Sequence, residues 1–197
     1  MANSKRKCAY CKERKPVETM FTSRLQSFCN KDHYIEYQVA SKDKLVKKGE
    51  KIQRKDLAER KKALKPVKWW QDMLQKLVNQ YVVHVRDKEM PCCTCGASSP
   101  SIKYDAGHYR TRKAAPELRY ELTNIHVQCS VNCNQYGSGM RSEYREFIKR
   151  NYGDDHLTWL DGKHKSLKEA FPHWSDYEAE IKRYRNLLRE NGVKPCT

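Results

Sequence analysis

The middle of the chain reads Cys92-Cys93-Thr94-Cys95, then Tyr104-Asp105-Ala106-Gly107-His108-Tyr109, then Cys129-Ser130-Val131-Asn132-Cys133-Asn134. Two cysteine pairs with these spacings can bind one tetrahedral Zn²⁺ ion through four thiolates. Such a site would hold a short strand carrying His108 against the start of a helix carrying Asn134. The sequence therefore predicts an α+β fold with a small zinc-stabilised core.

The composition indicates a small apolar core and an anionic partner. The chain has 197 residues, which allows one or two small domains, and only 38% of them are hydrophobic. Metal sites commonly stabilise modules that bury little surface. Forty Lys and Arg against 24 Asp and Glu give a formal net charge of +16. This excess favours nucleic acid as a partner, because basic side chains displace counterions from phosphates; a solvated basic surface is the alternative.

The nine cysteines point to metal binding and not to disulfides. The chain begins Met-Ala-Asn-Ser-Lys-Arg-Lys, without the apolar segment of a secretory signal, and no apolar run approaches the roughly 20 residues that cross a bilayer. We therefore expect a cytoplasmic protein, not associated with a membrane, whose cysteines are reduced. Seven cysteines and one histidine fill two four-ligand sites, which leaves Cys93 and Cys196 unassigned.

Residues 1–37 are predicted to form a separate N-terminal zinc module. Cys8 and Cys11 form a C-x2-C pair, and Cys29 and His33 form a C-x3-H pair at the start of a helix. These four residues predict a structural Cys3His zinc site.

Residues 38–66 are predicted to be a basic helical connector. Between residues 42 and 68 there are twelve Lys and Arg against four acidic residues, and few apolar side chains. A helix of this composition would be mostly solvated or would lie along DNA. A flexible charged spacer is the alternative.

Residues 67–152 are predicted to form the zinc-stabilised core. Pro66 is expected in the first turn of a helix, because apolar residues then recur at spacings of three and four up to Val85. This pattern indicates an amphipathic helix with a wide apolar face. The helix must end before Pro91, which leads into the first cysteine pair.

Residues 153–197 are predicted to be a C-terminal helical region. The preceding helix is expected to run from Arg141 to Asn151 and to stop at Gly153. The last helix is expected to begin with the capping box Ser175-Asp176-Tyr177-Glu178 and to end at Gly192.

The central segment contains the side chains that phosphodiester hydrolysis needs. That reaction requires a base to take a proton from water and a cation near the developing negative charge. His108 is suited to be the base at neutral pH, and Asp105 and Asn134 offer the oxygen ligands that Mg²⁺ prefers. The zinc would be structural, since sulfur fills all four of its positions. A role in a turn for Asp105 and in helix capping for Asn134 are the alternatives.

These residues resemble the HNH, or His-Me finger, nucleases, which have a ββα-metal core. The likeness to the NinG (Rap) recombination proteins of lambdoid phages is closer and covers most of residues 8 to 150. It is carried by Pro91-Cys92-x-x-Cys95-Gly96, Asp105-Ala106-Gly107-His108-Tyr109-Arg110-Thr111, Ala114-Ala115-Pro116, Asn124-Ile125-His126 and Gln128-Cys129.

The resemblance implies a structure-specific endonuclease that cleaves branched recombination intermediates, such as Holliday junctions and D-loops, in the host cytoplasm. It implies His108 as the general base, Asn134 as a ligand of a catalytic Mg²⁺ or Mn²⁺, and Asn124 as a brace for the loop that holds His108. The cations that follow the histidine suit phosphate contacts; they are Arg110, Arg112 and Lys113.

Two features depart from the nuclease pattern. Many HNH sites have a carboxylate directly before the base, where this chain has Gly107; Asp105 has the same strand parity and is expected to reach the metal instead. The second cysteine pair is C-x3-C where C-x2-C is commoner. A set of zinc ligands that includes Cys93 or His126 therefore stays open.

Two other functions compete with the nuclease. A non-catalytic double-zinc adaptor that binds nucleic acid would explain the charge and both zinc sites. A zinc deaminase is set aside, because it needs H-x-E upstream and the chain offers only His84-Val85-Arg86. Symmetric nicking of a junction would suit a homodimer, although no residue singles out an interface.

Overall fold

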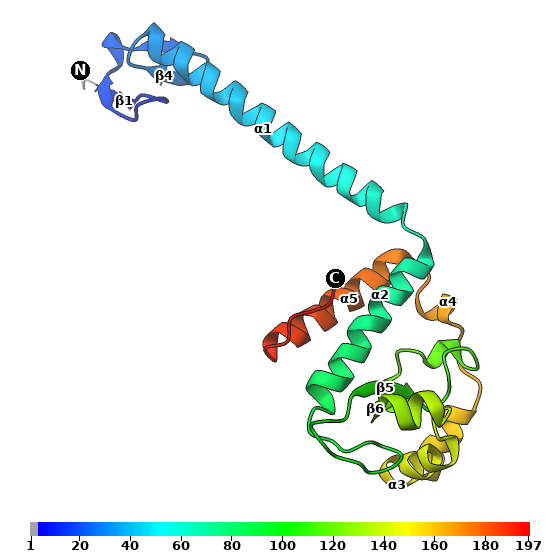
Figure 1. Cartoon of the computed structure of the whole chain (residues 1–197). Helices are drawn as coiled ribbons and strands as arrows, with labels where there is room; N and C mark the ends of the chain where they lie inside the picture. Colours follow the sequence, from blue (N-terminus) through cyan, green and yellow to red (C-terminus); the bar gives the residue numbers. More distant parts are fainter. Residues whose placement is uncertain (1–3) are drawn as a thin grey trace. The chain divides into compact units, whose positions relative to one another are not determined.

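The computed structural model describes residues 4–197 and divides into two compact units, one ending at Leu64 and one beginning at Lys65 (Figure 1). The described part contains helices and three two-stranded antiparallel sheets. The expected α+β class is therefore confirmed. Among the described residues, no helix combines the length and the apolar character needed to span a bilayer.

The N-terminal unit consists of two small hairpins and one long helix. The first hairpin pairs β1 (Lys5–Lys7) with β2 (Arg14–Pro16), the short helix η1 (Val17–Thr19) follows, and the second hairpin pairs β3 (Phe21–Ser23) with β4 (Gln26–Phe28). Very few side chains in these hairpins are buried. So small an apolar core cannot hold the hairpins in place without a further stabilising element.

Helix α1 (Lys31–Ala63) begins at Asn30, whose side chain accepts a hydrogen bond from the His33 backbone N–H. None of its residues is buried. The basic segment is therefore a solvated helix and not the flexible charged spacer that was the alternative. Ion pairs one turn apart, such as Arg60 with Asp56 at 2.9 Å, stabilise the exposed helix only slightly.

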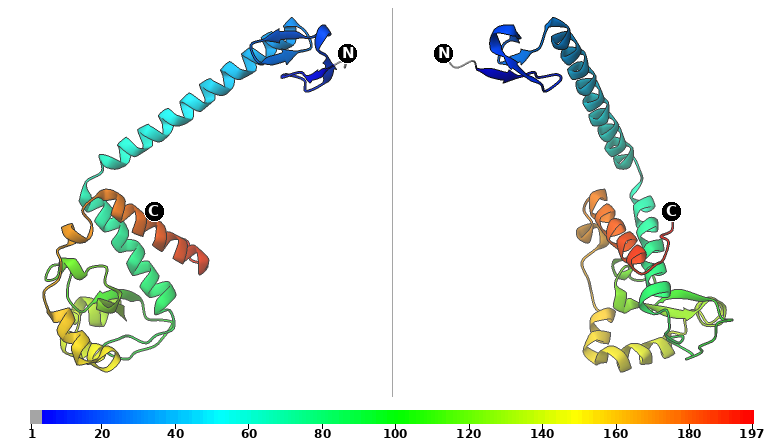
Figure 2. Two further views of the ribbon diagram at one scale, coloured as in Figure 1. Left: turned by 180° about the vertical axis from the view of Figure 1, so that it is seen from behind. Right: turned by 90° about the vertical axis from the view of Figure 1, so that its left-hand side faces the viewer.

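The core of the second unit lies between two helices that run in the same general direction, with Trp70 stacked on Trp174 near their starts and Tyr81 against Tyr184 further along. Helix α2 (Val67–Tyr81) continues into the π-helical segment η2 (Val82–Arg86), and α5 (Trp174–Glu190) lies alongside α2 in both Figure 1 and Figure 2. The apolar stripe expected on α2 is buried, from Trp70 through Val78. Pro66 precedes the helix as its N-cap residue and is not part of the first turn.

The strand that carries His108 belongs to a small central sheet. Strand β5 (Tyr104–His108) pairs antiparallel with β6 (Ile125–Cys129), so that Tyr104 lies opposite Cys129 and Gly107 opposite His126. The loop between them contains the short helices η3 (Pro116–Leu118) and η4 (Leu122–Asn124). The π-helical segment η5 (Ser130–Tyr136) follows β6 directly. One face of the sheet packs on α2 through Ile125, and every residue of β6 is buried.

One expected helix boundary was confirmed and one was wrong. The backbone leaves the helical conformation at Gly153, where φ is +86° and ψ is 170°, so the helix that begins at Arg141 is interrupted there as expected, and a second helical stretch completes α3 (Arg141–Asp161) beyond the kink. Glycine permits this conformation because it has no Cβ. After the short helix α4 (Leu167–Ala170), α5 (Trp174–Glu190) is capped by His173 with Asp176, two residues before the expected N-cap Ser175. The His173 ring accepts from the Ser175 N–H, and the Asp176 carboxylate accepts from the His173 N–H.

Candidate active site and metal centres

The central cysteines gather round a common point. The sulfur atoms of Cys92, Cys95, Cys129 and Cys133 all lie within 4.8 Å of one another, and those of Cys95 and Cys129 are 3.6 Å apart. A tetrahedral zinc with Zn–S bonds of about 2.3 Å separates its sulfurs by roughly 3.8 Å. The cluster thus has the dimensions of a closed four-sulfur zinc site.

The charges of this cluster require a cation. Burial opposes ionisation of Cys92, but hydrogen bonds from the Cys95 and Cys129 backbone and from Thr94 lower the pKa of the Cys92 thiol to about 6. Burial and the neighbouring thiols raise the pKa of the Cys129 thiol well above its ordinary value. The Cys92 thiol therefore ionises readily, whereas ionisation of Cys129 beside it is unfavourable. A bound metal ion would compensate the negative charge and allow all four sulfurs to ionise together.

The N-terminal cluster is built in the same way from Cys8, Cys11, Cys29 and His33. Cys8 Sγ lies 3.7 Å from His33 Nδ1, and Cys11 Sγ lies 3.5 Å from Cys29 Sγ. Burial opposes the Cys8 thiolate, yet backbone hydrogen bonds and His33 lower the pKa of this thiol to about 6. The two expected metal-binding groups are therefore present, and each suits a zinc ion.

The alternative ligands lie elsewhere. Cys93 is buried among apolar side chains next to Tyr144, and burial raises the pKa of its thiol far above the usual range. His126 bonds to two tyrosines. The longer C-x3-C spacing is accommodated because Cys133 lies in the π-helical segment η5, which winds more loosely than an α-helix.

A cavity of about 600 Å³ brings together the three side chains proposed for hydrolysis, Asp105, His108 and Asn134. Its other lining side chains include Asn79 from α2. The rest of the wall includes three arginines, a serine and a glycine, namely Arg110, Arg112, Ser138, Gly139 and Arg141. A group of acid, base and amide surrounded by cations is an arrangement that suits a phosphate ester.

The environment of His108 keeps its ring neutral. Burial lowers the pKa of His108 to about 4, and the charges of Arg112 and Arg119 add to the effect, although the Arg119 carbonyl opposes it. The Nε2 atom lies 3.2 Å from the Arg119 carbonyl oxygen. Gln75 Nε2 of α2 lies 3.4 Å from the same nitrogen and, as an amide nitrogen, can only donate. The Nε2 atom of His108 thus lies between one acceptor and one donor. An imidazole in this state can accept a proton.

The two oxygen-bearing side chains differ in how they are held. The Asp105 carboxylate accepts a hydrogen bond from the Ser130 hydroxyl at the start of η5. Asn134 lies within η5, while α3 has Met140 as its N-cap residue. Asn134 therefore does not cap α3, which was the alternative considered for it. Both side chains offer hard oxygen atoms to one cavity.

Asn124 is fully buried and braces the segment that follows His108. Its Oδ1 accepts from the Arg110 N–H at 2.8 Å, and its Nδ2 donates to the carbonyls of Arg110 and Leu118 at 3.1 Å each. The Tyr109 N–H in turn donates to the Asn124 carbonyl at 2.9 Å. Asn124 thus acts on the position of His108 and has no place in the cavity wall.

The three predicted phosphate contacts are not equivalent. Arg110 forms an ion pair with Asp161 at 2.9 Å, and Arg145 pairs with the other oxygen of the same carboxylate at 2.8 Å. Arg112 and Lys113 are exposed. The guanidinium of Arg110 is therefore partly engaged within the protein, whereas Arg112 and Lys113 face solvent.

Sequence reasoning missed Asn79, Ser130 and Arg141 as parts of this site. Asn79 is a polar residue of a helix whose pattern predicts only a buried apolar face, and nothing in the sequence places it near His108. Ser130 and Arg141 flank a loop with left-handed backbone at Ser138, Gly139 and Met140. The Gly137-Ser138-Gly139 run was the available signal, since such loops let backbone approach a ligand closely.

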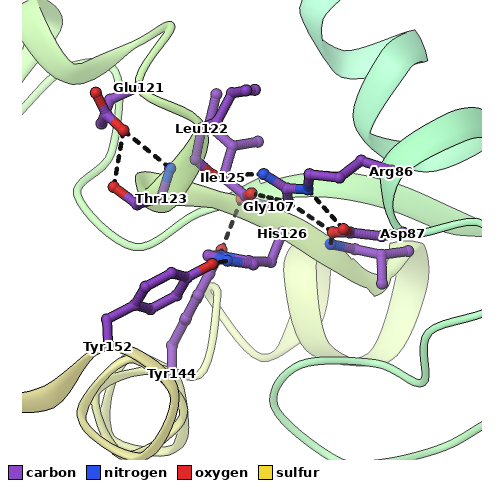
Figure 3. Close-up of polar contacts among 11 residues, drawn as sticks. Arg86, Asp87, Gly107, Glu121, Leu122, Thr123, Ile125, His126, Tyr144 and Tyr152 are labelled. Carbon is purple, nitrogen blue, oxygen red and sulfur yellow. Dashed lines mark hydrogen bonds and ion pairs between the residues drawn. The ribbon is translucent and has the colours of Figure 1, made fainter.

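A buried network of hydrogen bonds connects α3 to the strand of His108 (Figure 3). The Tyr144 hydroxyl donates to the Gly107 carbonyl at 3.0 Å, so His126 Nδ1, 3.1 Å away, must donate to the Tyr144 oxygen. His126 Nε2 then accepts from the Tyr152 hydroxyl at 2.8 Å. Burial lowers the pKa of His126 to about 3, and the Arg86 charge contributes, which agrees with a neutral ring.

The Arg86 guanidinium completes the network on the opposite side of the sheet edge. It donates to the carbonyls of Leu122 and Ile125 at 2.6 and 2.5 Å and pairs with Asp87. The Asp87 carboxylate also accepts from the Val127 backbone N–H at 3.1 Å. Strand β6 is thus fixed at its start by a buried ion pair and at its end by zinc ligands.

The fold and the site define a class: an α+β protein with two Cys/His metal-binding clusters, one of which shares η5 with a basic cavity lined by a partly buried histidine. A family model described as NinG, the bacteriophage lambda NinG protein, matches residues 1–192. A protein named ninG of Escherichia phage 933W is 33% identical over 202 residues, covering 95% of this chain and 97% of the relative.

Further relatives carry the same name. Protein ninG of Escherichia phage lambda is 37% identical over 135 residues, covering 66% of this chain and 65% of the relative, and that of Salmonella phage P22 has the same identity and coverage over this length. The chain belongs to the NinG family of phage proteins. No solved structure matches the chain.

Proposed function

We propose that the protein is a metal-dependent DNA endonuclease with a His-Me finger type of active site. One observation carries the proposal: Asp105, His108 and Asn134, which come from β5 and η5, line a single cavity whose wall also contains arginines. A structural zinc cluster directly beside these elements would keep them in place, as the expected ββα-metal core requires.

The chemistry follows from the state of each group. Neutral His108 accepts the proton of the attacking water. Asp105 and Asn134 are the residues that would hold Mg²⁺ or Mn²⁺, because both offer hard oxygens to the cavity. When bound, such an ion stabilises the negative charge of the phosphodiester as it is cleaved. Arg112, Lys113 and Arg141 bind flanking phosphates.

The glycine before the base supports Asp105 in this role. A side chain at position 107 would require Gln128 or the strand to shift, since even a Cβ there would stand 2.3 Å from Gln128 Oε1. Asp105 is the nearest acidic side chain on the same strand, and it lines the cavity. Asp105 would therefore supply the oxygen ligand from a position on β5 two residues before the one used in many HNH sites.

The substrate class rests on the family and on charge. A formal charge of +16 suits DNA, and the family resemblance implies branched recombination intermediates such as Holliday junctions and D-loops. The protein would act in the cytoplasm of the bacterial host. Two symmetric nicks in a junction would need two active sites, which favours a homodimer on DNA.

Cleavage of a four-way junction tests the proposal. Purified protein with its zinc content determined is incubated with Mg²⁺ or Mn²⁺ and either the junction or a linear duplex of the same sequence. We expect nicks near the branch of the junction, loss of nicking in His108→Ala, and unchanged DNA affinity and zinc content in that variant. His84→Ala, an exposed histidine of the same unit, is the matched control and should cleave normally.

The adaptor function is the competing outcome. If the wild-type protein binds junctions but leaves junctions, D-loops and flaps intact with either metal ion, the nuclease proposal fails and a double-zinc DNA-binding adaptor takes its place. In both cases affinity should fall steeply with added salt, because phosphate contacts dominate.

A further inference from the structure

A leucine stands at the tip of the second N-terminal hairpin with almost no contact to the rest of the protein. Strands β3 and β4 pair as far as Ser23 opposite Gln26, so the loop consists of Arg24 and Leu25 alone. The Leu25 side chain is 98% exposed, the highest value among the large apolar residues described. Water is an unfavourable environment for such a side chain, so it gains free energy by entering an apolar partner.

The backbone at this tip is strained, and a glycine at the first turn position would avoid the strain. Arg24 has φ of +54°, in the left-handed region. The first position of such a two-residue turn favours glycine, which adopts this conformation without steric cost. Here a long cation occupies it and stands next to the exposed leucine. The turn thus has a strained backbone and presents an arginine and a leucine side by side at its end.

An open groove of about 460 Å³ lies next to the tip. It is lined by Ser23, Arg24, Leu25, Gln26, Tyr34 and Gln38. The Tyr34 ring is fixed by packing on Phe21 and Phe28, with ring centres 5.2 and 5.3 Å apart. This volume is within the roughly 300–1,000 Å³ of pockets for small ligands. A rigid aromatic ring and two amide side chains offer stacking and hydrogen bonds to the same occupant.

The surroundings of the groove favour an anionic partner. Residues 4–30 contain seven Lys and Arg against two Glu. The strand β1, Lys5-Arg6-Lys7, is exposed along its whole length, and so are Arg14 and Lys15 of β2. An apolar protein segment would bury Leu25 equally well but would leave these cations without partners. A nucleic acid strand would match both the cations and the aromatic groove.

We propose that the tip of the β3–β4 hairpin and the adjoining groove form a binding site for an unpaired nucleobase, with Leu25 inserted next to it as a wedge. Apolar side chains inserted between bases open the stack, and an extruded base stacks on aromatic rings while amides bond its edge. Tyr34 supplies the ring, and Gln26 and Gln38 the amides. This site rests on the proposed function only in taking DNA as the partner, and it selects DNA with a branch or a single-stranded segment.

Fluorescence of 2-aminopurine, which rises when the base leaves the stack, tests the site. The full-length, zinc-loaded protein is titrated onto a four-way junction with 2-aminopurine at the branch, without Mg²⁺ or Mn²⁺. We expect a rise in fluorescence with wild type that Leu25→Ser loses. The affinity of Leu25→Ser for the junction should fall at least about fivefold, while that for linear duplex stays unchanged, because serine cannot act as the apolar wedge that keeps the base out of the stack.

Two further variants separate this site from general DNA binding. Leu45→Ser, the same change at a 69% exposed leucine of α1, should behave as wild type. Arg24→Gly relieves the strained backbone and should still weaken junction binding. The proposal is overturned if wild type gives no fluorescence rise, if Leu25→Ser binds the junction as wild type does, or if Leu25→Ser loses junction and duplex affinity equally. No arm measures cleavage, so the result stands whether or not the protein is a nuclease.

Discussion

Gly107 lies directly against the side chain of Gln128, so closely that a Cβ on Gly107 would stand 2.3 Å from Gln128 Oε1. Gln128 cannot move aside easily, because its Nε2 donates to the Gly139 carbonyl at 2.8 Å and to the Thr94 hydroxyl at 3.2 Å. These bonds join the loop of the cavity to the zinc cluster. The residue before the proposed base is glycine for a steric reason, and Gln128 occupies the space that a carboxylate would need.

Gly107→Ala should therefore destabilise the second unit. Forcing a methyl group into this packed position costs roughly 1–3 kcal/mol, because either Gln128 or the strand must shift. Urea unfolding of the zinc-loaded protein measures the loss. In the double variant Gly107→Ala/Gln128→Ala the new methyl group no longer meets the amide. The loss of stability in the double variant should therefore be smaller than the sum of the losses in the two single variants. Additive losses would contradict the contact.

The zinc sites should be separable. Cys95→Ser removes one ligand of the central cluster, and we expect the zinc content to fall from two ions to one per chain, with unfolding of the second unit. Cys11→Ser should also lose one ion, but should leave the thermal transition of the second unit unchanged, since the units have separate cores. Metal analysis and calorimetry on both variants check this. Loss of both ions from either variant would contradict two independent sites.

Much of this architecture could be predicted from spacing alone. Cysteine pairs and the α2 stripe are local patterns, and local patterns gave the two clusters and the buried face of α2. The break at Gly153 also follows from a local signal, whereas the helical stretch beyond it packs into the same core as Ile148 through Leu157 and Leu160. The start of α5 was predicted wrongly, because His173 with Asp176 caps the helix where the Ser175 box was expected.

The environment of His108 was beyond the reach of sequence reasoning. Its ring contacts the Arg119 carbonyl and Gln75, which are 11 and 33 residues away along the chain. Which nitrogen holds the lone pair depends on these contacts, and no spacing rule predicts them. The sequence could suggest that a histidine acts as a base, whereas its lowered pKa follows from burial that only the fold creates.

Asn124 should be important for stability as well as for the position of His108. Asn124→Ala leaves the buried Arg110 N–H and Leu118 carbonyl without partners, which costs roughly 2–4 kcal/mol. Asn124→Asp keeps the acceptor for Arg110 N–H but turns a carboxylate toward two carbonyls, so it should be at least as destabilising. Denaturant unfolding of the three proteins gives the order. A value for Asn124→Ala within experimental error of wild type would show that the brace is unimportant.

His126 should make the protein lose stability in mild acid. Its pKa is about 3 when folded, against 6.5 for an ordinary histidine, because burial and the Arg86 charge oppose protonation. The unfolded chain thus binds more protons between these values. Stability is constant above pH 6.5 with respect to this group and falls by about 1.4 kcal/mol for each pH unit below it, until the folded pKa is reached.

The variant His126→Asn isolates this effect, since asparagine does not titrate. The variant is expected to be less stable than wild type at neutral pH, because Tyr144 and Tyr152 lose a shared partner. Its stability should nevertheless fall less steeply with acid, so the gap between the two proteins narrows as the pH drops toward 4.5. Zinc release and titration of His108 affect both proteins alike and cancel in the difference. Parallel pH profiles would mean that the pKa of His126 is the same in the folded and unfolded protein, and would contradict a folded pKa lowered by burial.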